Sequence, residues 1–184
     1  MRTTRLTAAS LAAFFLLAAP AYAGIDAGGG FTEQADAVVA AAAPRHFIWP
    51  ANGEVTRGFG FDPTTGEQHA GVDVGSLRSL DVHAAVGGIV EKVGYAAGFD
   101  GYGQIVLEDV GGGEELLYAH LSQVDVQPGQ VLQTGDRLGL AGSTGLSTGV
   151  HLHFELRRDG TAVDPSSLLP GGAPTVPAEY PSAS

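Results

Sequence analysis

The chain has 184 residues, of which 44% are hydrophobic, enough for one domain with a buried core and flanking segments. Its 28 glycines and 10 prolines favour many turns between short strands, and therefore an all-β fold with little helix. The 20 Asp and Glu residues outnumber the 9 Lys and Arg residues, which excludes a phosphate-neutralising surface and so a nucleic-acid partner. There is no cysteine, so the fold must hold together without disulfides.

Residues 1–23 have the three parts of a secretory signal peptide: two arginines, an apolar run and the small-residue site Ala21-Tyr22-Ala23. A membrane anchor is the alternative, but the apolar run is shorter than the ~20 residues that a spanning helix needs. We therefore expect cleavage after Ala23, export to the periplasm or the medium, and no membrane span in the mature chain. Loss of the two arginines would leave 7 basic and 20 acidic residues, a still more acidic protein.

Two low-complexity segments flank the expected domain. The segment 24–46 is rich in Gly and Ala, lacks a two-sided hydrophobic pattern and is predicted to be a tether. The segment 170–184, PGGAPTVPAEYPSAS, has the composition of a disordered tail. The folded domain is therefore expected at residues 47–169.

Within this domain, short hydrophobic runs with a β-type pattern are separated by glycine-rich turns. Gly87-Gly88 and Gly111-Gly112-Gly113 fall where hairpin turns are expected. No helical periodicity runs for more than a turn or two, so the pattern predicts an antiparallel β-sheet domain with irregular loops. The clearest runs lie at 81–96, 102–110, 115–121, 137–142 and 151–160.

The segment GVHLHFEL contains two histidines that are candidates for chemistry. His151 and His153 lie one residue apart in a predicted strand, so they point to one face, about 7 Å apart along the backbone. Leu152 and Phe154 then point into the core, and Glu155 returns to the histidine face. By spacing alone, a pair of polar residues on a solvated strand face is the simpler explanation.

His69 and Asp73 stand four residues apart in QHAGVDVG. In a fully extended strand they would lie roughly 13 Å apart, too far to share one ion, and Gly71 with the β-branched Val72 and Val74 disfavours a helix. A curled loop that bends at Gly71 and enters a strand remains possible. Because the chain has no cysteine, a metal site must use His and carboxylate ligands, and two imidazoles with one carboxylate form the pattern of catalytic zinc.

His120 lies in ELLYAHLS, where strand alternation predicts that it shares a face with Tyr118. Taken alone, His120 would be an ordinary strand residue. Tyr118 could line a groove or pack in the core.

Three motifs in this order resemble the lysostaphin-type zinc endopeptidases of bacterial cell walls: H-x-x-x-D at 69–73, LYAHL at 117–121 and GSTGLSTGVHLHFE at 142–155. The likeness covers about residues 50–166, spacers included. It implies a duplicated-hybrid-motif-like barrel with a groove, one Zn²⁺ per chain, a monomeric protein, and peptidoglycan stem peptides as substrate.

Carried over by residue, the resemblance implies that His69, Asp73 and His153 bind zinc. It also implies that His120 and His151 are catalytic, orienting or deprotonating the water and stabilising the oxyanion.

Three further residues are open to interpretation. Glu155 could support the metal ligands from behind or pair with Arg157 on the same face, and the latter is favoured. His46 and His83 are expected to be structural or surface residues.

Three positions depart from the family pattern. Val150 stands where proline is usual, Asp62 where arginine is common, and His83 where Tyr or Val is typical. None is an inferred ligand, so we expect these changes to affect groove shape and substrate preference.

Two other functions compete with this one. Non-catalytic relatives that regulate wall hydrolases have typically lost zinc ligands, whereas all five inferred residues are present here. A biotinyl or lipoyl carrier is suggested by VQPGQVLQTGDRLG, but the only lysine, Lys92, lacks the Met-Lys-Met or Asp-Lys-Ala setting of a modified lysine.

The scissile bond is not determined. D-Ala–diaminopimelate cross-links, glycine bridges and Gly-Gly bonds in secreted proteins all suit such a groove. The acidic surface disfavours adhesion to teichoic-acid-rich walls and favours a periplasmic enzyme that acts on its own wall.

Overall fold

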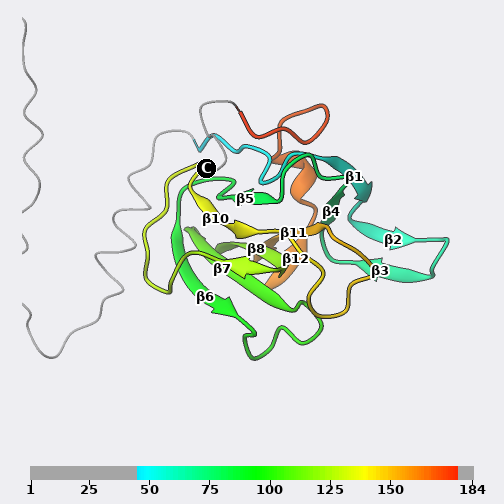
Figure 1. Cartoon of the computed structure of the whole chain (residues 1–184), viewed down its shortest axis with the longest axis horizontal. Coiled ribbons are helices and arrows are strands. Elements are labelled where there is room, and N and C mark those ends of the chain that lie inside the picture. Colours follow the sequence, from blue (N-terminus) through cyan, green and yellow to red (C-terminus); the bar gives the residue numbers. More distant parts are fainter. Residues whose placement is uncertain (1–44, 178–184) are drawn as a thin grey trace, which may run out of the picture. The chain divides into compact units, whose positions relative to one another are not determined.

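A computed structural model describes residues 45–177 of the chain (Figure 1). The predicted signal peptide, nearly all of the tether and residues 178–184 lie outside the described residues. In the described part, no helix is long and apolar enough to cross a membrane. The elements are β1 (Glu54–Arg57), β2 (Gly60–Asp62), β3 (Glu67–His69), β4 (Val72–Gly75), β5 (Asp81–His83), β6 (Ile89–Gly94), β7 (Gln104–Gly111), β8 (Glu114–Leu121), β9 (Gln123–Val124), β10 (Arg137–Leu140), β11 (Leu152–Arg158), β12 (Thr161–Val163) and the 3₁₀ helix η1 (Pro165–Ser167).

The main sheet has the strand order β1-β4-β11-β8-β7-β6, with β12 paired to β11. Its strand pairs are antiparallel, which confirms the predicted all-β, antiparallel fold with little helix. Within residues 45–177, β1 and β6 remain the two edges of this sheet and do not pair with each other, so the expected barrel is not closed. A second sheet, β5-β10-β9, covers one face instead.

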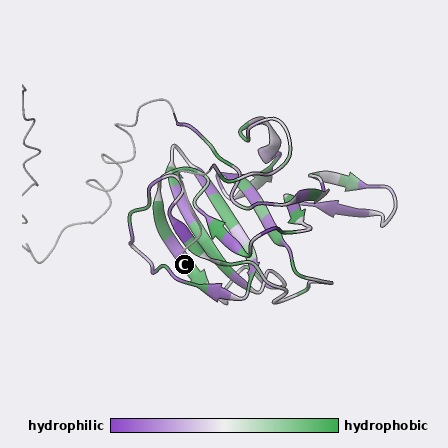
Figure 2. Cartoon of the chain, turned by 45° about the horizontal axis from the view of Figure 1, so that its top comes forward, coloured by the Kyte–Doolittle hydropathy of each residue, from purple (hydrophilic) through white to green (hydrophobic). Residues whose placement is uncertain are grey.

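The core lies between these two sheets. Val82 from β5 and Leu138 from β10 pack in one cluster with Val106, Tyr118 and Phe154 from the main sheet. Hydrophobic and hydrophilic residues alternate along several strands, as expected for strands whose successive side chains face opposite ways (Figure 2). Complete burial of one such large side chain contributes about 1.5–3 kcal/mol.

The opposite face of β7 and β8 carries a smaller cluster. Ile105, Leu107, Leu117 and Ala119 are completely buried there, and Phe99 from the preceding loop packs against them. Both faces of β7 and β8 are therefore covered, which makes these strands a rigid base for the segments that follow them.

The glycine-rich turns have two different roles. Gly111-Gly112-Gly113 connects β7 to β8 in a hairpin, as predicted, with φ angles of 80°, 70° and 76°. Gly87-Gly88, in contrast, joins β5 to β6, which belong to different sheets, so the predicted hairpin is wrong at this position. A Cβ at Gly88 would lie 2.5 Å from the carbonyl oxygen of Asp109, so glycine allows a close approach here.

The β2–β3 hairpin projects from the main sheet and leads directly into β4 (Figure 1). Between β3 and β4 the chain bends at Gly71, where a Cβ would lie 2.3 Å from the carbonyl oxygen of Phe154. Only glycine fits this approach, so the bend that the sequence suggested is built against β11.

The first part of the predicted tail contacts the domain. The indole Nε1 of Trp49 donates a hydrogen bond to the carbonyl of Pro170 (2.9 Å), and Val176 is buried. The amide of Val176 donates to Oδ1 of Asn52 (2.6 Å). The packed part of the chain thus extends beyond residue 169.

Candidate metal centre

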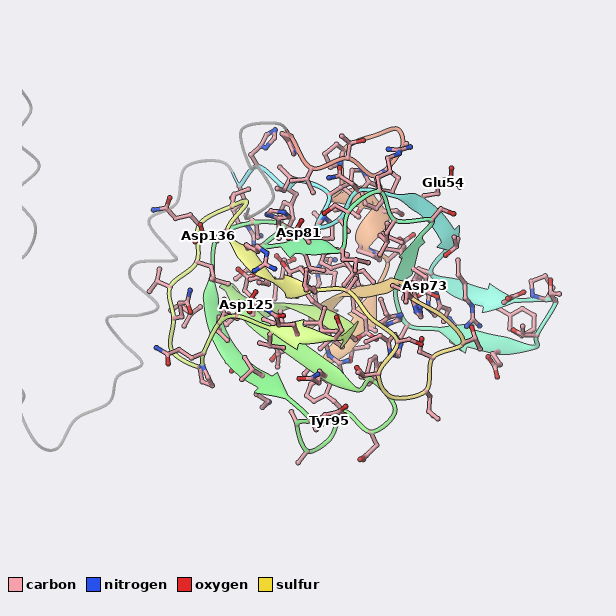
Figure 3. All side chains as sticks on the ribbon, in the orientation of Figure 1. Glu54, Asp73, Asp81, Tyr95, Asp125 and Asp136 are labelled. Atoms are coloured by element: carbon pink, nitrogen blue, oxygen red, sulfur yellow. The ribbon has the colours of Figure 1, made fainter. Side chains whose placement is uncertain are left out.

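Three strands bring His69, Asp73 and His153 together. His69 ends β3, and the bend at Gly71 places Asp73 in β4, near the base of the β2–β3 hairpin (Figure 3). In the antiparallel pair of β4 and β11, His153 lies directly opposite Asp73. Side chains at such paired positions are close neighbours on one face of the sheet.

The donor atoms of these residues converge on one point. Oδ1 of Asp73 lies 2.8 Å from Nδ1 of His153 and 3.2 Å from Nε2 of His69. The two ring nitrogens lie 3.1 Å apart. Among residues 45–177, this is the one group of three or more His and carboxylate side chains whose geometry suits a metal ion.

The other nitrogen of His69 faces away from this point. It lies 2.8 Å from the carbonyl oxygen of Gly58. Because a carbonyl can only accept, Nδ1 of His69 carries the proton and donates it, which leaves the lone pair of Nε2 facing Asp73 and His153.

Glu155 contacts the ring nitrogen of His153 that faces away from Asp73, as the carbonyl of Gly58 does for His69. Its Oε1 lies 3.0 Å from Nε2 of His153 and accepts a hydrogen bond from the hydroxyl of Tyr102 (2.6 Å). Its Oε2 accepts from Nη1 of Arg157 (2.8 Å). The two roles considered for Glu155 are therefore both present, one on each carboxylate oxygen. Tyr102 was not singled out in the sequence, where only its place in a Gly-rich loop marks it.

The electrostatics keep both carboxylates ionised. Burial alone would raise the pKa of Asp73, but the neighbouring imidazoles of His153 and His69 outweigh it and hold the pKa well below its usual value. Burial likewise opposes ionisation of Glu155, and hydrogen bonds from His153 and Tyr102 reverse the effect and lower its pKa. Burial and the neighbouring Glu155 raise the pKa of Tyr102 to about 12, so it remains a neutral donor. This negative charge suits a bound cation.

His120 and His151 form a second pair beside the first group. Their ring centroids lie 4.8 Å apart. Nδ1 of His120 lies 2.8 Å from the carbonyl oxygen of Thr144, and Nδ1 of His151 lies 2.9 Å from that of Gly149. Both Nδ1 atoms therefore donate, and Nε2 is the nitrogen of each ring that does not contact a backbone carbonyl. Burial lowers the pKa of His120, with a further contribution from His151, which favours its neutral form.

The prediction that His120 shares a face with Tyr118 is wrong. Tyr118 is buried in the core against Phe154, with ring centroids 5.3 Å apart, whereas His120 lies beside His151. The cause is a bulge: Gln104 pairs with Leu121 and Val106 with Tyr118, so two residues of β8 lie opposite one residue of β7. His120 takes the left-handed conformation at this bulge, with φ of 61°.

All five predicted residues line one groove of about 680 Å³. The loops at 100–102 and 145–148 line it as well, and Arg57 lies at its edge. This volume is within the usual range of small-ligand sites. His46 is exposed outside the groove, and His83 is buried with Nδ1 donating to Gly135, so both have the structural or surface roles expected of them.

The departures from the family pattern lie in different places. Oδ2 of Asp62 lies 3.7 Å from Nε of Arg57, a residue that lines the groove. Val150 is exposed directly before His151. Two of the three departures thus lie at or beside the groove, while His83 is in the core.

Comparison with known proteins decides which family this arrangement represents. The model of peptidase family M23 matches residues 67–165, which include all five groove residues. The chain belongs to this family. It is the family of the lysostaphin-type peptidases that the sequence motifs resemble.

Three members illustrate the likeness. The chain is 39% identical over 100 residues to the DD-carboxypeptidase/endopeptidase Mpg of Neisseria meningitidis, over 54% of this chain and 22% of that protein. A zinc containing peptidase from Vibrio cholerae superposes with a TM-score of 0.56 at 29% identity, over 65% of this chain and 39% of that one. The catalytic domain of lysostaphin from Staphylococcus simulans has a TM-score of 0.54 at 30% identity, over 62% of this chain and 90% of that one. The aligned region spans 22–45% of the length of the first curated relatives matched.

Proposed function

We propose that this M23 chain is a zinc-dependent endopeptidase that hydrolyses peptide cross-links in bacterial peptidoglycan. The observation that carries the proposal is the convergence of His69, Asp73 and His153 beside His120 and His151 in one groove. The names of relatives support it, because one is a DD-carboxypeptidase/endopeptidase and another a zinc containing peptidase.

The three donor atoms fit zinc. Ligands at about 2.0–2.1 Å from a tetrahedral zinc ion lie about 3.3 Å from one another. The separations among His69, Asp73 and His153 are 2.8, 3.1 and 3.2 Å, and one carboxylate with two imidazoles is the ligand set of open catalytic sites. When bound there, zinc would supply Lewis acidity that acidifies a water molecule and polarises the scissile carbonyl.

The remaining residues account for proton movement. Burial lowers the pKa of His120 and so favours the neutral ring, whose Nε2 would accept the proton of the attacking water and return it to the leaving amine. His151 lies beside His120, with its Nε2 3.6 Å from Oδ1 of Asp73, and a proton on this nitrogen would form a hydrogen bond to the developing oxyanion. Tyr102 and Glu155 hold His153 in place and do not react.

The proposal places the enzyme outside the cytoplasm. Residues 1–23 would direct export, residues 24–46 would tether a monomeric catalytic domain, and the substrate would be the stem peptides of the wall of its own cell. The excess of acidic residues favours a wall without teichoic acids.

Digestion of isolated walls tests the function. The full chain loaded with zinc should release soluble fragments, and mass analysis of fragments from walls of known cross-link type should identify the bond. His153→Ala should abolish zinc binding and release. His120→Ala should retain zinc and lose on the order of 10²–10⁴-fold in rate.

The exposed His46 provides the matched control, and His46→Ala should behave as the unaltered chain. Full activity of the metal-free protein or of His153→Ala would exclude the proposed mechanism. A chain that binds walls and zinc without releasing fragments would instead be a non-catalytic member of the family.

A further inference from the structure

The bulge in β8 interrupts the backbone hydrogen bonds between β7 and β8, and the side chain of Thr144 supplies hydrogen bonds at this point. Gln104 and Leu121 are paired across the two strands. The hydroxyl of Thr144 accepts a hydrogen bond from the amide of Gln104 (3.0 Å) and donates one to the carbonyl of Leu121 (2.8 Å). The hydroxyl thus bridges two backbone groups that flank the bulge and satisfies both.

The backbone of the same residue holds the ring of His120. Its carbonyl accepts a hydrogen bond from Nδ1 of His120 (2.8 Å), and its amide lies 3.4 Å from the carbonyl of His120. Thr144 therefore contacts the histidine through its main chain and supports the strained backbone beside it through its side chain.

The loop that carries Thr144 packs closely against a second loop of the groove. A Cβ at Gly103 would lie 2.4 Å from Oγ1 of Thr144, and a Cβ at Gly145 would lie 2.4 Å from the carbonyl oxygen of Gly101. The amide of Leu146 also donates to the carbonyl of Gly101 (2.7 Å). These contacts pack the loop at 144–146 tightly against the loop at 101–103.

We infer that Thr144 is a positioning residue for His120: its hydroxyl maintains the bulge and its carbonyl sets the ring, so that Nε2 faces the groove. The catalytic consequence of this inference rests on the proposed function. A misplacement of about 1 Å can cost on the order of 100-fold in rate, so the position of this ring matters for turnover. Thr144 has no hydrogen bond to the three proposed metal ligands, so its effect should be separable from zinc binding.

Two substitutions separate the hydroxyl from the shape of the side chain. In the full chain loaded with zinc, Thr144→Val should lower kcat on the order of 10- to 100-fold while leaving KM and zinc affinity within about threefold. Thr144→Ser restores the hydroxyl and should keep kcat within about threefold of the unaltered chain. Ser143→Ala, which removes a neighbouring exposed hydroxyl that bonds only within its own loop, should have no effect.

A measurement on the ring itself makes the inference independent of activity. Nitrogen-15 NMR of the His120 ring in the unaltered chain should show Nδ1 protonated, and the amide of Gln104 should exchange slowly with solvent. In Thr144→Val the Gln104 amide should exchange rapidly and the Nδ1 signal should broaden or shift, and Thr144→Ser should restore both.

Several results would overturn the inference. The first is an unprotonated Nδ1 of His120 in the unaltered chain. The second is that Thr144→Val leaves both kcat and the ring spectrum unchanged. The third is that Thr144→Ser lowers kcat as much as Thr144→Val does. If Thr144→Val does not fold, the ring spectrum of the unaltered chain and the kcat of Thr144→Ser still test the role of Thr144. If even the unaltered chain cleaves no wall, the proposed function fails, while the ring spectrum still decides the role of Thr144.

Discussion

Glu155 is completely buried, and its Oε1 lies 3.0 Å from Nε2 of His153. A buried carboxylate in this position prevents rotation of the imidazole and increases its basicity as a ligand. Glu155→Gln should therefore lower zinc affinity on the order of 10- to 100-fold, measured by competition with a chelator. Glu114→Gln removes a carboxylate that pairs with Arg158 outside the groove and should leave zinc affinity unchanged. Equal effects of the two substitutions would contradict a specific role for Glu155.

The left-handed backbone of His120 predicts an inverted order of stability. Glycine in a strand usually costs about 0.5–1 kcal/mol relative to alanine. At a φ of 61°, however, a Cβ is strained, so His120→Gly should be more stable than His120→Ala by about 1 kcal/mol. Chemical denaturation of both variants measures the difference. Ala119→Gly, at the neighbouring position without positive φ, should show the usual loss, and the same sign at both positions would refute the prediction.

The buried Glu108 predicts a pH-dependent stability. Burial raises its pKa from the usual 4.5 to about 8, although the hydroxyl of Tyr118 donates to Oε2 (2.8 Å) and opposes the shift. Between these two pH values the folded chain holds a proton that the unfolded chain has lost, so this residue's contribution to stability falls as the pH rises. The fall is at most about 1.4 kcal/mol per pH unit.

Glu108→Gln should remove this contribution. Relative to the unaltered chain, the variant should gain stability steadily from pH 5 to pH 8 in denaturant unfolding. The exposed Glu54→Gln serves as the control and should show no such trend. A constant difference between Glu108→Gln and the unaltered chain across this range would show that Glu108 is ionised in the folded state.

Contacts of the C-terminal segment predict where the chain can be shortened. Deletion of residues 170–184 removes the buried Val176 and the hydrogen bonds to Trp49 and Asn52, and should lower the free energy of unfolding by about 2–4 kcal/mol. Ala173→Ser, at an exposed position of the same segment, should change it by less than about 0.5 kcal/mol. Thermal unfolding of the two variants measures the difference, and equal stabilities would show that the contacts of Val176 and Pro170 contribute nothing.

Local patterns were enough to predict much of the strand architecture. The alternation in GVHLHFEL places Leu152 and Phe154 in the core and Glu155 beside His153, because successive side chains of a strand face opposite sides. Gly71 marked the bend before β4, since glycine is the residue that tolerates such a close approach. The resemblance of the three motifs to the lysostaphin-type family then implied that five polar residues share one site.

Other features depend on contacts between distant segments. The closure of the barrel could not be decided from strand patterns, because sheet edges are set by which strands find partners. The tail from Pro170 has a disordered composition, yet Val176 is buried because a site formed by Trp49 and Asn52 receives that segment.

The sequence by itself determined the residue types of the groove, the strand that carries His153, and the glycine at which the chain can bend between His69 and Asp73. Only the tertiary structure decided on which face His120 lies. Strand periodicity assigns it to the face of Tyr118, and the bulge opposite β7 moves it to the other. A bulge is a mismatch between two strands, and its hydrogen bonds are completed by Thr144 from a third segment, so no local pattern around His120 contains it.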